Sequence, residues 1–496
     1  MMAELWKIAD IIDAVKGALY HPISDKPMQP IMGISIDTRT LAKGDLFIPL
    51  IGDNHDGHDH IKAAIDKGAA CVLIDQRRAE TIDLAHINAA IPLIKVQDCL
   101  EALQDLARHR RNQSAAKIIG ITGSVGKTGA TSALALALAK FGAVHATKGN
   151  LNNHIGMPLS LARMKLETEY GIFEMGMNHA GEIHFLSHLA RPDIALITNI
   201  ASAHSENFDH PQDIALAKLE IADGLSPKGH LIALRESPYY PLIFKKTQHQ
   251  NCALTSFGKH PQADFHLDHI ASNPDQLTAN IHHKSNDYTL NIAAISDGLA
   301  ITLSSVAPVL DALGLSVQTG LDALRAFEIP KGRGNKIISN RYDFPVTLID
   351  ESYNASPIAV KAALKHFDAV AHKGRKIVIL GDFAELGGMA QDHYTSIAAA
   401  LTGMILDQIW LVGKDIISNK NMQMLNDSYQ GDFNQGASNY SLDHRSKCLF
   451  FKDVNALLYD IKSLVKPHDF ILVKGSNSAK LSHLIDEFTQ APKETS

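Results

Sequence analysis

The chain has 496 residues, more than one hydrophobic core usually serves, so we expect two or three domains. Lysine and arginine number 47 against 53 aspartate and glutamate, and the formal net charge of -6 argues against a protein held mainly to nucleic acid phosphates. Hydrophobic residues make up 45% and charged residues 20%, a mixture typical of a folded soluble protein rather than a disordered one.

Cysteine usage and hydropathy indicate the compartment. The four cysteines lie far apart and form no CxxC pair: Cys71, Cys99, Cys252 and Cys448. A disulfide scaffold or a thiolate zinc site is therefore not expected, and a reducing compartment fits. No apolar run reaches the roughly 18 residues that span a bilayer, and the acidic, amphipathic N-terminus lacks the order of a signal peptide. We expect a cytoplasmic enzyme without membrane insertion.

The first 112 residues are predicted to form a small α/β domain. Its strands are short, as at Gly33–Asp37 and Val72–Asp75. The polar stretch Arg108–Lys117 stands just before the first strongly apolar strand. We therefore place an N-terminal domain at residues 1–112.

Residues 113–329 are predicted to form a central domain with a mainly parallel sheet and helices on both faces. Short apolar runs alternate there with helical stretches, as in such α/β domains. These runs are Lys117–Thr122, Tyr170–Met175, Asp193–Ile200 and His230–Leu234. The polar stretch Lys245–Asn286 is predicted to hold surface strands and loops.

A second set of apolar runs predicts a separate doubly wound, Rossmann-like domain at residues 330–496. The runs are Val346–Asp350, Lys376–Leu380, Gln408–Val412 and Phe470–Val473. The polar stretch Ile329–Asn335 precedes them and marks the second seam. The stretch Ser418–His444 is again predicted to hold surface strands and loops.

The strongest chemical signal is a glycine-rich loop, GITGSVGKT at Gly120–Thr128, between an apolar strand and the helical stretch Thr128–Phe141. Such a loop can place backbone N–H groups and the positive end of a helix around phosphates. Lys127 can then reach the β- and γ-phosphates, and the Thr128 hydroxyl can ligate Mg²⁺. Ile121 stands where the usual pattern has glycine, so the alternative is a plain glycine turn. We predict ATP or GTP binding.

Two further side chains follow neighbouring strands of the predicted central sheet. Glu174 ends one apolar run, and His204 follows another. The carboxyl ends of parallel strands are where α/β sheets bind ligands, and Mg²⁺ needs an oxygen ligand there. Taken singly, Glu174 reads equally well as a surface acid, and His204 as an incidental loop histidine. Lys218, in a helical stretch, reads by itself as a solvated lysine.

The phosphate loop with Glu174 and His204 resembles the Mur ligases, the ATP-dependent amide-forming enzymes of peptidoglycan synthesis. The resemblance runs through most of the chain and rests on many segments in the same order and spacing. The other matching segments are Ser35–Arg39, Lys43–Phe47, Asn54–His58, Asn150–Pro158, Glu174–Glu182, Lys331–Arg333, Asp350–Ala355, Gly381–Gly387 and Val473–Ser476.

The resemblance implies a reaction and its participants. ATP would phosphorylate the carboxyl group of UDP-N-acetylmuramoyl tripeptide, and D-alanyl-D-alanine would attack the acyl phosphate. The products would be UDP-muramoyl pentapeptide, ADP and phosphate. The resemblance also implies ATP and two Mg²⁺ ions, a monomeric chain and no nucleic acid partner.

The resemblance further implies a role for individual residues. A catalytic set would comprise Lys127, His204, Lys218 and Arg333. ATP would be held by Gly123, Ser124, Val125, Gly126, Lys127, Thr128 and Gly129, with Arg333 at the γ-phosphate, Asp350 at the ribose and Tyr353 and Asn354 beside the nucleotide. The metal ligands would be Thr128, Glu174, His204 and a Lys218 carbamylated by CO₂. The UDP-sugar would contact Ser35, Asp37, Thr38 and Arg39.

Further substrate contacts would come from the cleft and the last domain. The cleft residues would be Asn152, Asn153, Asn178 and His179, whereas Lys474 and Ser476 would help to form the dipeptide pocket. Plainer readings exist for several of these positions. Asp37 to Arg39 could be a strand-to-turn cap, Asn152 and Asn153 could be turn residues, and Arg333 could be an exposed linker arginine. Asp350 could end its strand as an ordinary turn residue.

The chain departs from the family pattern in places. The loop 205–210 after His204 differs, Gly129 replaces a common serine or threonine, and Asn477 stands where arginine is frequent. Asn291 and Asp297 are rival matches for the adenine-binding position. The alternatives to the implied reaction are a sister ligase that adds a diamino acid as the third residue, a folylpolyglutamate synthase, and a nucleotide-binding regulator with a degenerate site.

Overall fold

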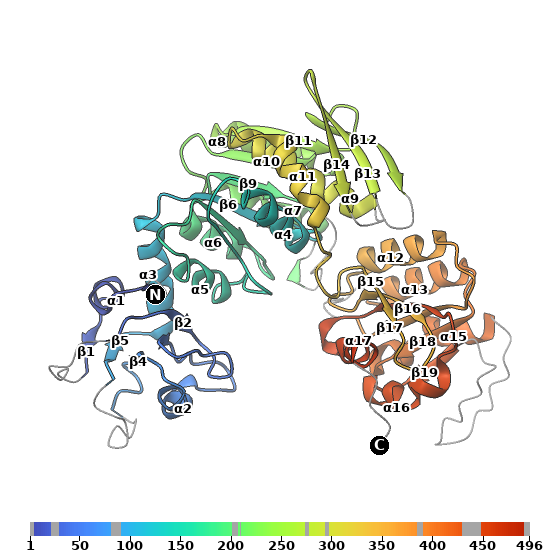
Figure 1. Cartoon of the computed structure of the whole chain (residues 1–496), viewed down its shortest axis with the longest axis horizontal. Helices are drawn as coiled ribbons and strands as arrows, with labels where there is room; N and C mark the ends of the chain where they lie inside the picture. The colour runs from blue at the N-terminus through green and yellow to red at the C-terminus, as the bar shows by residue number, and fades with distance from the viewer. Residues whose placement is uncertain are drawn as a thin grey trace. The chain divides into compact units, whose positions relative to one another are not determined.

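The structure is a computed structural model that describes residues 4–20, 29–80, 91–200, 207–208, 210–272, 277–292, 297–383, 390–428 and 448–490. The chain divides into two compact units. The first comprises residues 1–200, 216–292 and 297–327, and the second comprises residues 201–215, 293–296 and 328–496. Three β-sheets form the cores, two in the first unit and one in the second (Figure 1).

The N-terminal sheet of the first unit has five short strands in the order β1-β5-β4-β3-β2. Only β1 pairs antiparallel, with β5. The strands are β1 (Ala18–Leu19), β2 (Gly33–Ser35), β3 (Asp45–Phe47), β4 (Cys71–Asp75) and β5 (Leu93–Val96). The helices are α1 (Ile8–Val15), the 3-10 turn η1 (Gly57–His60), α2 (Ile61–Asp66) and α3 (Cys99–Gln113). A small α/β domain was predicted here and is confirmed.

The central sheet has nine strands in the order β14-β13-β12-β11-β10-β9-β6-β8-β7. All neighbours are parallel except the pairs β12–β13 and β13–β14. The strands are β6 (Lys117–Thr122), β7 (Val144–Ala146), β8 (Tyr170–Glu174), β9 (Ile194–Ile197), β10 (His230–Leu234), β11 (Ala253–Gly258), β12 (Phe265–Ser272), β13 (Leu277–His283) and β14 (Asn286–Ile292). The mainly parallel central sheet that the apolar runs predicted is therefore confirmed.

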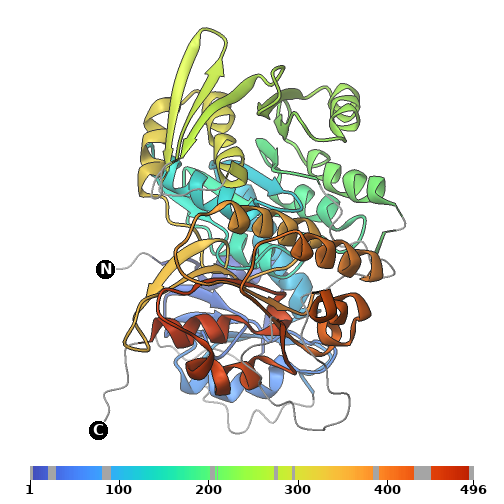
Figure 2. The ribbon, with the colours of Figure 1, turned by 90° about the vertical axis from the view of Figure 1, so that its right-hand side faces the viewer.

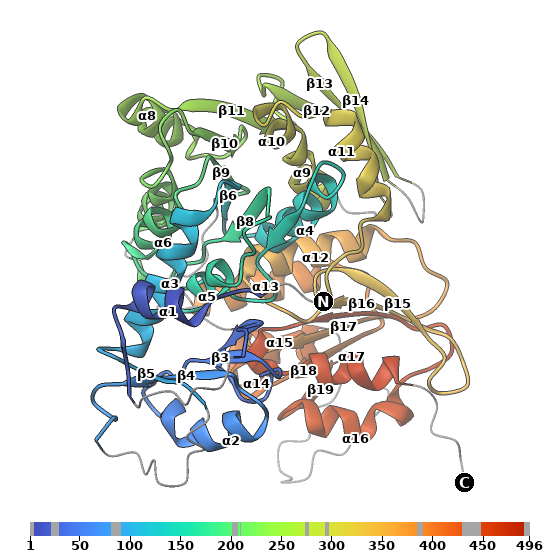
Figure 3. The same cartoon turned by 60° about the vertical axis from the view of Figure 1, so that its left-hand side comes forward.

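Two groups of helices cover this sheet. The helix α4 contacts α9, α10 and α11, whereas α6 contacts α3, α5 and η4, and the groups lie on either side of β6 and β8 (Figure 3). The bounds are α4 (Lys127–Leu138), α5 (Gly156–Ala162), α6 (Glu182–Ala190), α7 (Pro211–Leu219), η4 (Glu220–Ala222), α8 (Tyr240–Gln250), α9 (Asp297–Ser304), α10 (Val306–Ala312), α11 (Val317–Ala323) and η5 (Leu324–Ala326). The prediction of helices on both faces of the central sheet is therefore confirmed.

The sheet of the second unit has six strands in the order β15-β16-β20-β17-β18-β19, with only β15–β16 antiparallel. The strands are β15 (Asn335–Ser339), β16 (Val346–Glu351), β17 (Lys376–Gly381), β18 (Gln408–Val412), β19 (Cys448–Phe451) and β20 (Phe470–Lys474). The helices are α12 (Pro357–Ala369), α13 (Ala390–Thr402), α14 (Lys414–Ser418), α15 (Lys420–Ser428), α16 (Val454–Leu464), η7 (Asn477–Ala479) and α17 (Ser482–Thr489).

Alternation along the middle strand explains why this unit is doubly wound. Val378 and Leu380 of β17 belong to a core with the α12 and α13 side chains, while Ile377 and Ile379 belong to a second core with α16 and α17. Successive side chains of a strand point to opposite faces, so an all-apolar strand needs helices on both. The two helix groups lie above and below the sheet (Figure 1 and Figure 2). The Rossmann-like prediction is confirmed.

The structure also shows the state of the cysteines and the hydropathy of the helices. All four cysteines are free of disulfides. Within the described residues, no helix combines the length and the hydropathy that a bilayer crossing needs.

Candidate active site

The loop between β6 and α4 has a conformation that only glycine allows at two positions. The φ angles of Gly123 and Gly126 are +152° and +91°. A Cβ atom on Gly123 would overlap the Oγ1 of Thr198, and one on Gly126 would lie 3.0 Å from the Oγ1 of Thr302. Glycine removes the Cβ that would occupy this space and permits close backbone approach to a ligand. The strand–loop–helix order fits a triphosphate cradle better than a plain turn.

The carboxyl end of β9 holds this loop in place. The Thr198 hydroxyl donates to the Val125 carbonyl at 2.6 Å, and the Ser124 N–H donates to the Asn199 carbonyl at 2.9 Å. Thr198 is itself buried. The loop is therefore fixed by a neighbouring strand before any nucleotide arrives.

Lys127 and Thr128 begin α4, where backbone N–H groups lack helical partners and the helix dipole favours anions. The Lys127 Nζ donates to the Gly123 carbonyl at 2.6 Å, across the mouth of the loop. A phosphate could replace that carbonyl as the partner of the ammonium. Gly129 follows in the first turn of α4 and is buried, and a Cβ atom there would lie 3.8 Å from side-chain atoms of Leu299 and Thr302.

Thr128 and Glu174 meet at the end of β8. The Thr128 hydroxyl donates to Glu174 Oε2 at 3.3 Å, and the Glu174 N–H donates to the Thr147 hydroxyl at 3.1 Å. Glu174 is buried, and only 1% of its surface is exposed. A buried carboxylate next to a hydroxyl offers the oxygen ligands that Mg²⁺ prefers, so these residues fit the ion that the sequence implies.

His204 lies outside the described residues, as do 205, 206 and 209 of the altered loop. In the remainder of the chain that the structure covers, no three histidine, cysteine, aspartate or glutamate side chains gather as a metal-binding group. Thr128 and Lys218 are not of those residue types. The full set of magnesium ligands therefore stays a prediction.

Lys218 is a buried lysine rather than a solvated one. The residue is 2% exposed. Burial holds the pKa of its ammonium well below the ordinary value, and the positive charge of Lys127 lowers that pKa further. Both effects favour the neutral amine over the ammonium, and only the neutral amine has a nitrogen lone pair that can react. The plainer reading of Lys218 from sequence is contradicted by this burial.

The asparagines and His179 predicted to face the substrate lie in two turns of the first unit. The Asn152 carbonyl accepts the Gly176 N–H at 2.8 Å, and Asn153 Oδ1 accepts the Gly156 N–H at 2.8 Å where α5 begins. Asn178 and His179 are exposed just before α6. Their turn is tied by Glu182, which accepts the Asn178 N–H at 2.9 Å and contacts His179 Nδ1 at 3.1 Å.

The residues predicted to bind the UDP-sugar follow β2. The Ser35 hydroxyl donates to the Asp37 carbonyl at 2.9 Å, and the Lys67 ammonium donates to the Thr38 carbonyl at 2.7 Å. The Asp37 carboxylate accepts the Arg39 N–H and its guanidinium, which lowers the pKa of the carboxyl. The Arg39 side chain is 88% exposed. Locally this is the strand-to-turn cap of the plainer reading, and the turn ends β2 at Ser35 rather than at Asp37.

The residues of the second unit that are predicted to bind the nucleotide lie near the start of β15 and the end of β16. The Arg333 guanidinium lies 4.1 Å from the centre of the Tyr353 ring. Asp350 is buried, and its carboxylate accepts the Gly332 N–H at 2.9 Å and the Ser352 hydroxyl at 2.6 Å. The structure thus shows Asp350 organising two turns, and its contact with a ribose stays a prediction.

Lys474 and Ser476 are buried at the end of β20. The Lys474 Nζ donates to Glu351 Oε2 and to the Asn354 carbonyl, both at 3.0 Å. The Ser476 hydroxyl donates to the Asp382 carbonyl at 2.6 Å. Both side chains therefore brace strand-end turns, and their part in a dipeptide pocket stays a prediction.

The remaining predicted positions are less informative. Asn291 lies on β14, where its Oδ1 accepts the Thr278 hydroxyl at 2.8 Å, and Asp297 begins α9. Asn477 begins η7. The adenine contact therefore stays open between Asn291 and Asp297.

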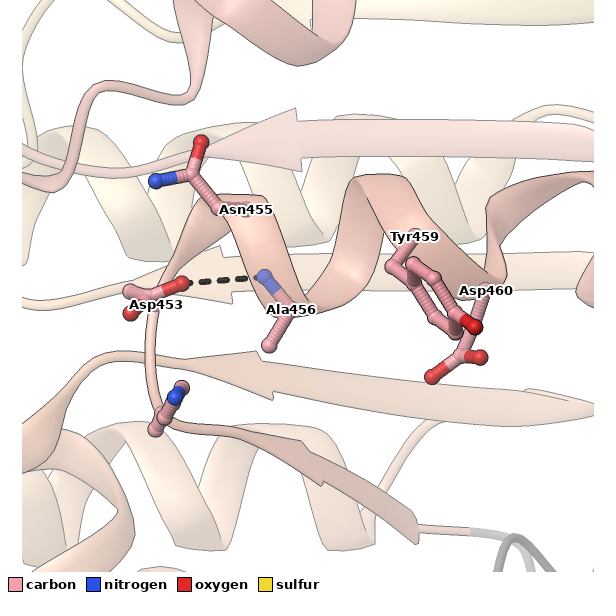
Figure 4. A pocket seen from close by; sticks show the side chains of 6 residues that line it. Asp453, Asn455, Ala456, Tyr459 and Asp460 are labelled. Carbon is pink, nitrogen blue, oxygen red and sulfur yellow. Dashed lines mark hydrogen bonds between the residues drawn. The ribbon is translucent and has the colours of Figure 1, made fainter.

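A surface hollow of about 460 Å³ lies on the second unit (Figure 4). Its lining residues are Lys452, Asp453, Asn455, Ala456, Tyr459 and Asp460. The Asp453 carboxylate already accepts the Ala456 N–H at 2.9 Å, which caps α16. None of the predicted site residues lines this hollow, so it is not the site described above.

Two residues of the site escaped the sequence reasoning. Thr198 holds the phosphate loop, and Glu220 holds the turn of Asn178 and His179 through contacts with the start of α6. Thr198 could have been predicted, because it is a polar residue directly after β9, the strand next to β6. Nothing in the sequence distinguished Glu220 from a surface acid.

Comparison with known proteins gives one consistent family. Three family models match the chain: "Mur ligase family, catalytic domain" at residues 30–111, "Mur ligase middle domain" at 121–299, and "Mur ligase, glutamate ligase domain" at 336–477. The chain is similar to UDP-N-acetylmuramoyl-tripeptide--D-alanyl-D-alanine ligase of Bacillus subtilis, with 30% identity over 98% of each chain. The Rickettsia prowazekii protein of the same name is 33% identical over 92% of this chain and 94% of that one.

Solved structures resemble the whole chain. A crystal structure of MurF from Acinetobacter baumannii covers 97% of this chain and 98% of its own, with a TM-score of 0.81 and 26% identity. MurF ligase from Thermotoga maritima in complex with ADP covers 92% of this chain and 96% of its own, with a TM-score of 0.72 and 22% identity. At that identity the second likeness concerns the fold alone.

Proposed function

Because the chain belongs to the Mur ligase family, we propose that it joins D-alanyl-D-alanine to UDP-N-acetylmuramoyl tripeptide with ATP as the energy source. Relatives named for this reaction match it over nearly their whole length, 98% of the Bacillus subtilis protein and 94% of the Rickettsia prowazekii protein. The observation that carries the proposal is the glycine loop at 123–128, whose shape fits a triphosphate. The chain would act in the cytoplasm, as a monomer.

The first chemical step activates a carboxyl group. A carboxylate is a poor electrophile, so the γ-phosphoryl of ATP is transferred to one carboxylate oxygen, which forms an acyl phosphate and releases ADP. The N–H groups of the loop and the Lys127 ammonium stabilise the charge on the phosphates. Bound Mg²⁺ would neutralise further negative charge there, held by Thr128, Glu174, His204 and the modified Lys218.

The second step forms the amide. The amine of D-alanyl-D-alanine attacks the acyl carbon, a tetrahedral intermediate forms, and its collapse breaks the bond to phosphate while the amine loses a proton. Acyl phosphates hydrolyse, so water must be kept out until the dipeptide binds. Arg333, Asp350, Tyr353 and Asn354 are proposed for the nucleotide on the family resemblance.

We also propose that Lys218 is carbamylated. A neutral amine attacks CO₂, a nitrogen–carbon bond forms, and the nitrogen loses one proton to give a carbamate anion. The burial of Lys218 and its lowered pKa support this step, because they favour the neutral amine and an ammonium has no lone pair to donate. The carbamate would give the site an oxygen ligand where the sequence has a cation.

A direct test is the mass of the product. Purified protein is incubated with ATP, D-alanyl-D-alanine and UDP-N-acetylmuramoyl tripeptide, with either diaminopimelate or lysine as the third residue. Formation of the pentapeptide with equimolar phosphate supports the proposal and shows which tripeptide is preferred. Product only from the muramoyl dipeptide and a free diamino acid would indicate the sister ligase, and no phosphate release would indicate a regulator.

A further inference from the structure

We propose that Glu220 is a positioning residue that sets the turn 178–182 and thereby the affinity for the muramoyl peptide. The inference deepens the proposed function and rests on it, since that turn carries Asn178 and His179, the residues expected to contact this substrate. Glu220 itself would not touch the substrate.

The Glu220 carboxylate binds the backbone where the turn enters α6. Both of its oxygens accept the Gly181 N–H, at 2.8 and 3.0 Å, and Oε2 also accepts the His184 N–H at 3.1 Å. The first N–H groups of a helix have no helical acceptor, and a negative charge there is favoured by the helix dipole. Gly181 has a φ of +89°, so the chain turns sharply at the residue that Glu220 holds.

The turn is held from two sides by carboxylates. Glu182, from α6 itself, accepts the Asn178 N–H at 2.9 Å and contacts the His179 ring at 3.1 Å. Glu220 anchors the other end of the same turn. Removal of Glu220 would leave Glu182 as the carboxylate that holds this turn among the described hydrogen bonds, and the conformation at Gly181 would be less tightly specified.

Other hydrogen bonds join α6 to the segment 221–224 without involving residues 178–182. The buried Ser187 hydroxyl donates to the Ile221 carbonyl at 2.6 Å and accepts the Gly224 N–H at 3.1 Å. Asp223 contacts the His184 ring at 2.9 Å. These bonds keep α6 docked without Glu220, so its loss would change the turn more than the fold.

Glu220 also follows Lys218 by two residues in one continuous helical segment. Residues two apart on a helix point in nearly opposite directions, about 160° apart, since each residue turns the chain by about 100°. One side of the segment therefore presents Lys218 close enough to Lys127 to lower its pKa, and the other holds the substrate turn. The same helical segment therefore positions both Lys218 and the turn 178–182.

Kinetic constants of three variants test the role. Glu220→Ala removes every carboxylate contact, and Glu220→Gln keeps one acceptor oxygen. Asp223→Asn removes a like charge that contacts the His184 side chain of α6 but none of the backbone N–H groups that Glu220 binds. We expect Glu220→Ala to raise KM for UDP-N-acetylmuramoyl tripeptide about tenfold or more, the scale of a misplaced contact. The KM for ATP should change less than about twofold, as for a loss of binding confined to one substrate. Glu220→Gln should lie between Ala and wild type.

The control and the contrary outcomes are distinct. Asp223→Asn should keep both KM values even where its melting temperature falls as far as that of Glu220→Ala. Equal increases in both KM values, the same pattern in Asp223→Asn, or an unchanged peptide KM in Glu220→Ala would overturn the positioning role. If Glu220→Ala does not fold, the peptide KM of Glu220→Gln decides. Wild-type protein that makes no product would instead refute the proposed function.

Discussion

Replacing Thr198 by valine tests the contact that shapes the phosphate loop. Valine has nearly the shape of threonine but no hydroxyl, so the 2.6 Å bond to the Val125 carbonyl and the longer 3.3 Å contact with the Thr122 carbonyl are lost while the buried packing stays. A hydrogen bond of this kind contributes about 0.5–1.5 kcal/mol. The Thr198 Oγ1 also occupies the space beside Gly123, so its loss affects the loop at two points.

The expected consequence is weaker nucleotide binding with an intact fold. If the lost bond must be compensated when ATP orders the loop, about 1–1.4 kcal/mol corresponds to a KM for ATP that is about five- to tenfold higher. The KM for the muramoyl tripeptide should not change, because the turn 178–182 is held by other residues.

Initial rates against ATP concentration measure the effect, and Thr198→Ser is the matched control. Serine keeps the hydroxyl and should restore the ATP KM to within about twofold of wild type, since the lost methyl group contributes no polar contact. The reasoning fails if valine leaves the ATP KM unchanged, or if serine and valine raise it equally.

The remaining predictions concern other parts of the same unit. Lys127→Ala should abolish product formation, measured as pentapeptide, because it removes the ammonium proposed to stabilise the charge on the β- and γ-phosphates. Gly126→Ala should lower stability by about 1–2 kcal/mol in denaturant unfolding, since its φ of +91° is left-handed. Isotope-labelled bicarbonate should give a carbamate signal in the wild type, and Lys218→Arg should remove that signal and abolish activity. Burial lowers the pKa of His145 in the folded protein to about 4, so between pH 7 and pH 5 this imidazole takes up a proton in the unfolded chain but not in the folded one. His145 should therefore lower the free energy of unfolding by about 2 kcal/mol from pH 7 to pH 5, and the decrease should be smaller in His145→Gln.

The parallel strands were predictable because they are buried on both faces. The apolar runs of β6, β8 and β10 stand out in the sequence, and the structure confirms them with small changes at their ends. The strands β12 and β13 lie in the stretch Lys245–Asn286 that was anticipated only as surface strands and loops, and β14 begins where that stretch ends. In β13, Leu277, Ala279 and Ile281 face inward and alternate with Thr278 and Asn280, so half of the strand reads as polar.

The site likewise has a part that the sequence predicts and a part that only the structure shows. The glycine loop is contiguous, so its sequence carries both the conformation and the chemistry. Thr198 and Glu220 act on partners 73 and 39 residues away, and no local pattern links such positions. The burial of Lys218 was equally hidden, because a single lysine among apolar neighbours in a helical stretch is usually solvated. Only the fold brings that amine near Lys127.

The charge arrangement at Lys218 explains why the proposed carbamate would be stable there. Two ammonium groups close together in a buried region repel each other, so the structure favours the neutral form of Lys218. Addition of CO₂ replaces that amine by an anion, and the interaction with Lys127 changes from repulsion to attraction. The same burial would destabilise an isolated carbamate, so the anion needs Lys127 and the bound metal as partners. Removal of the Lys127 charge should therefore lower carbamate occupancy as well as catalysis, and a Lys127→Met variant with full occupancy would contradict this coupling.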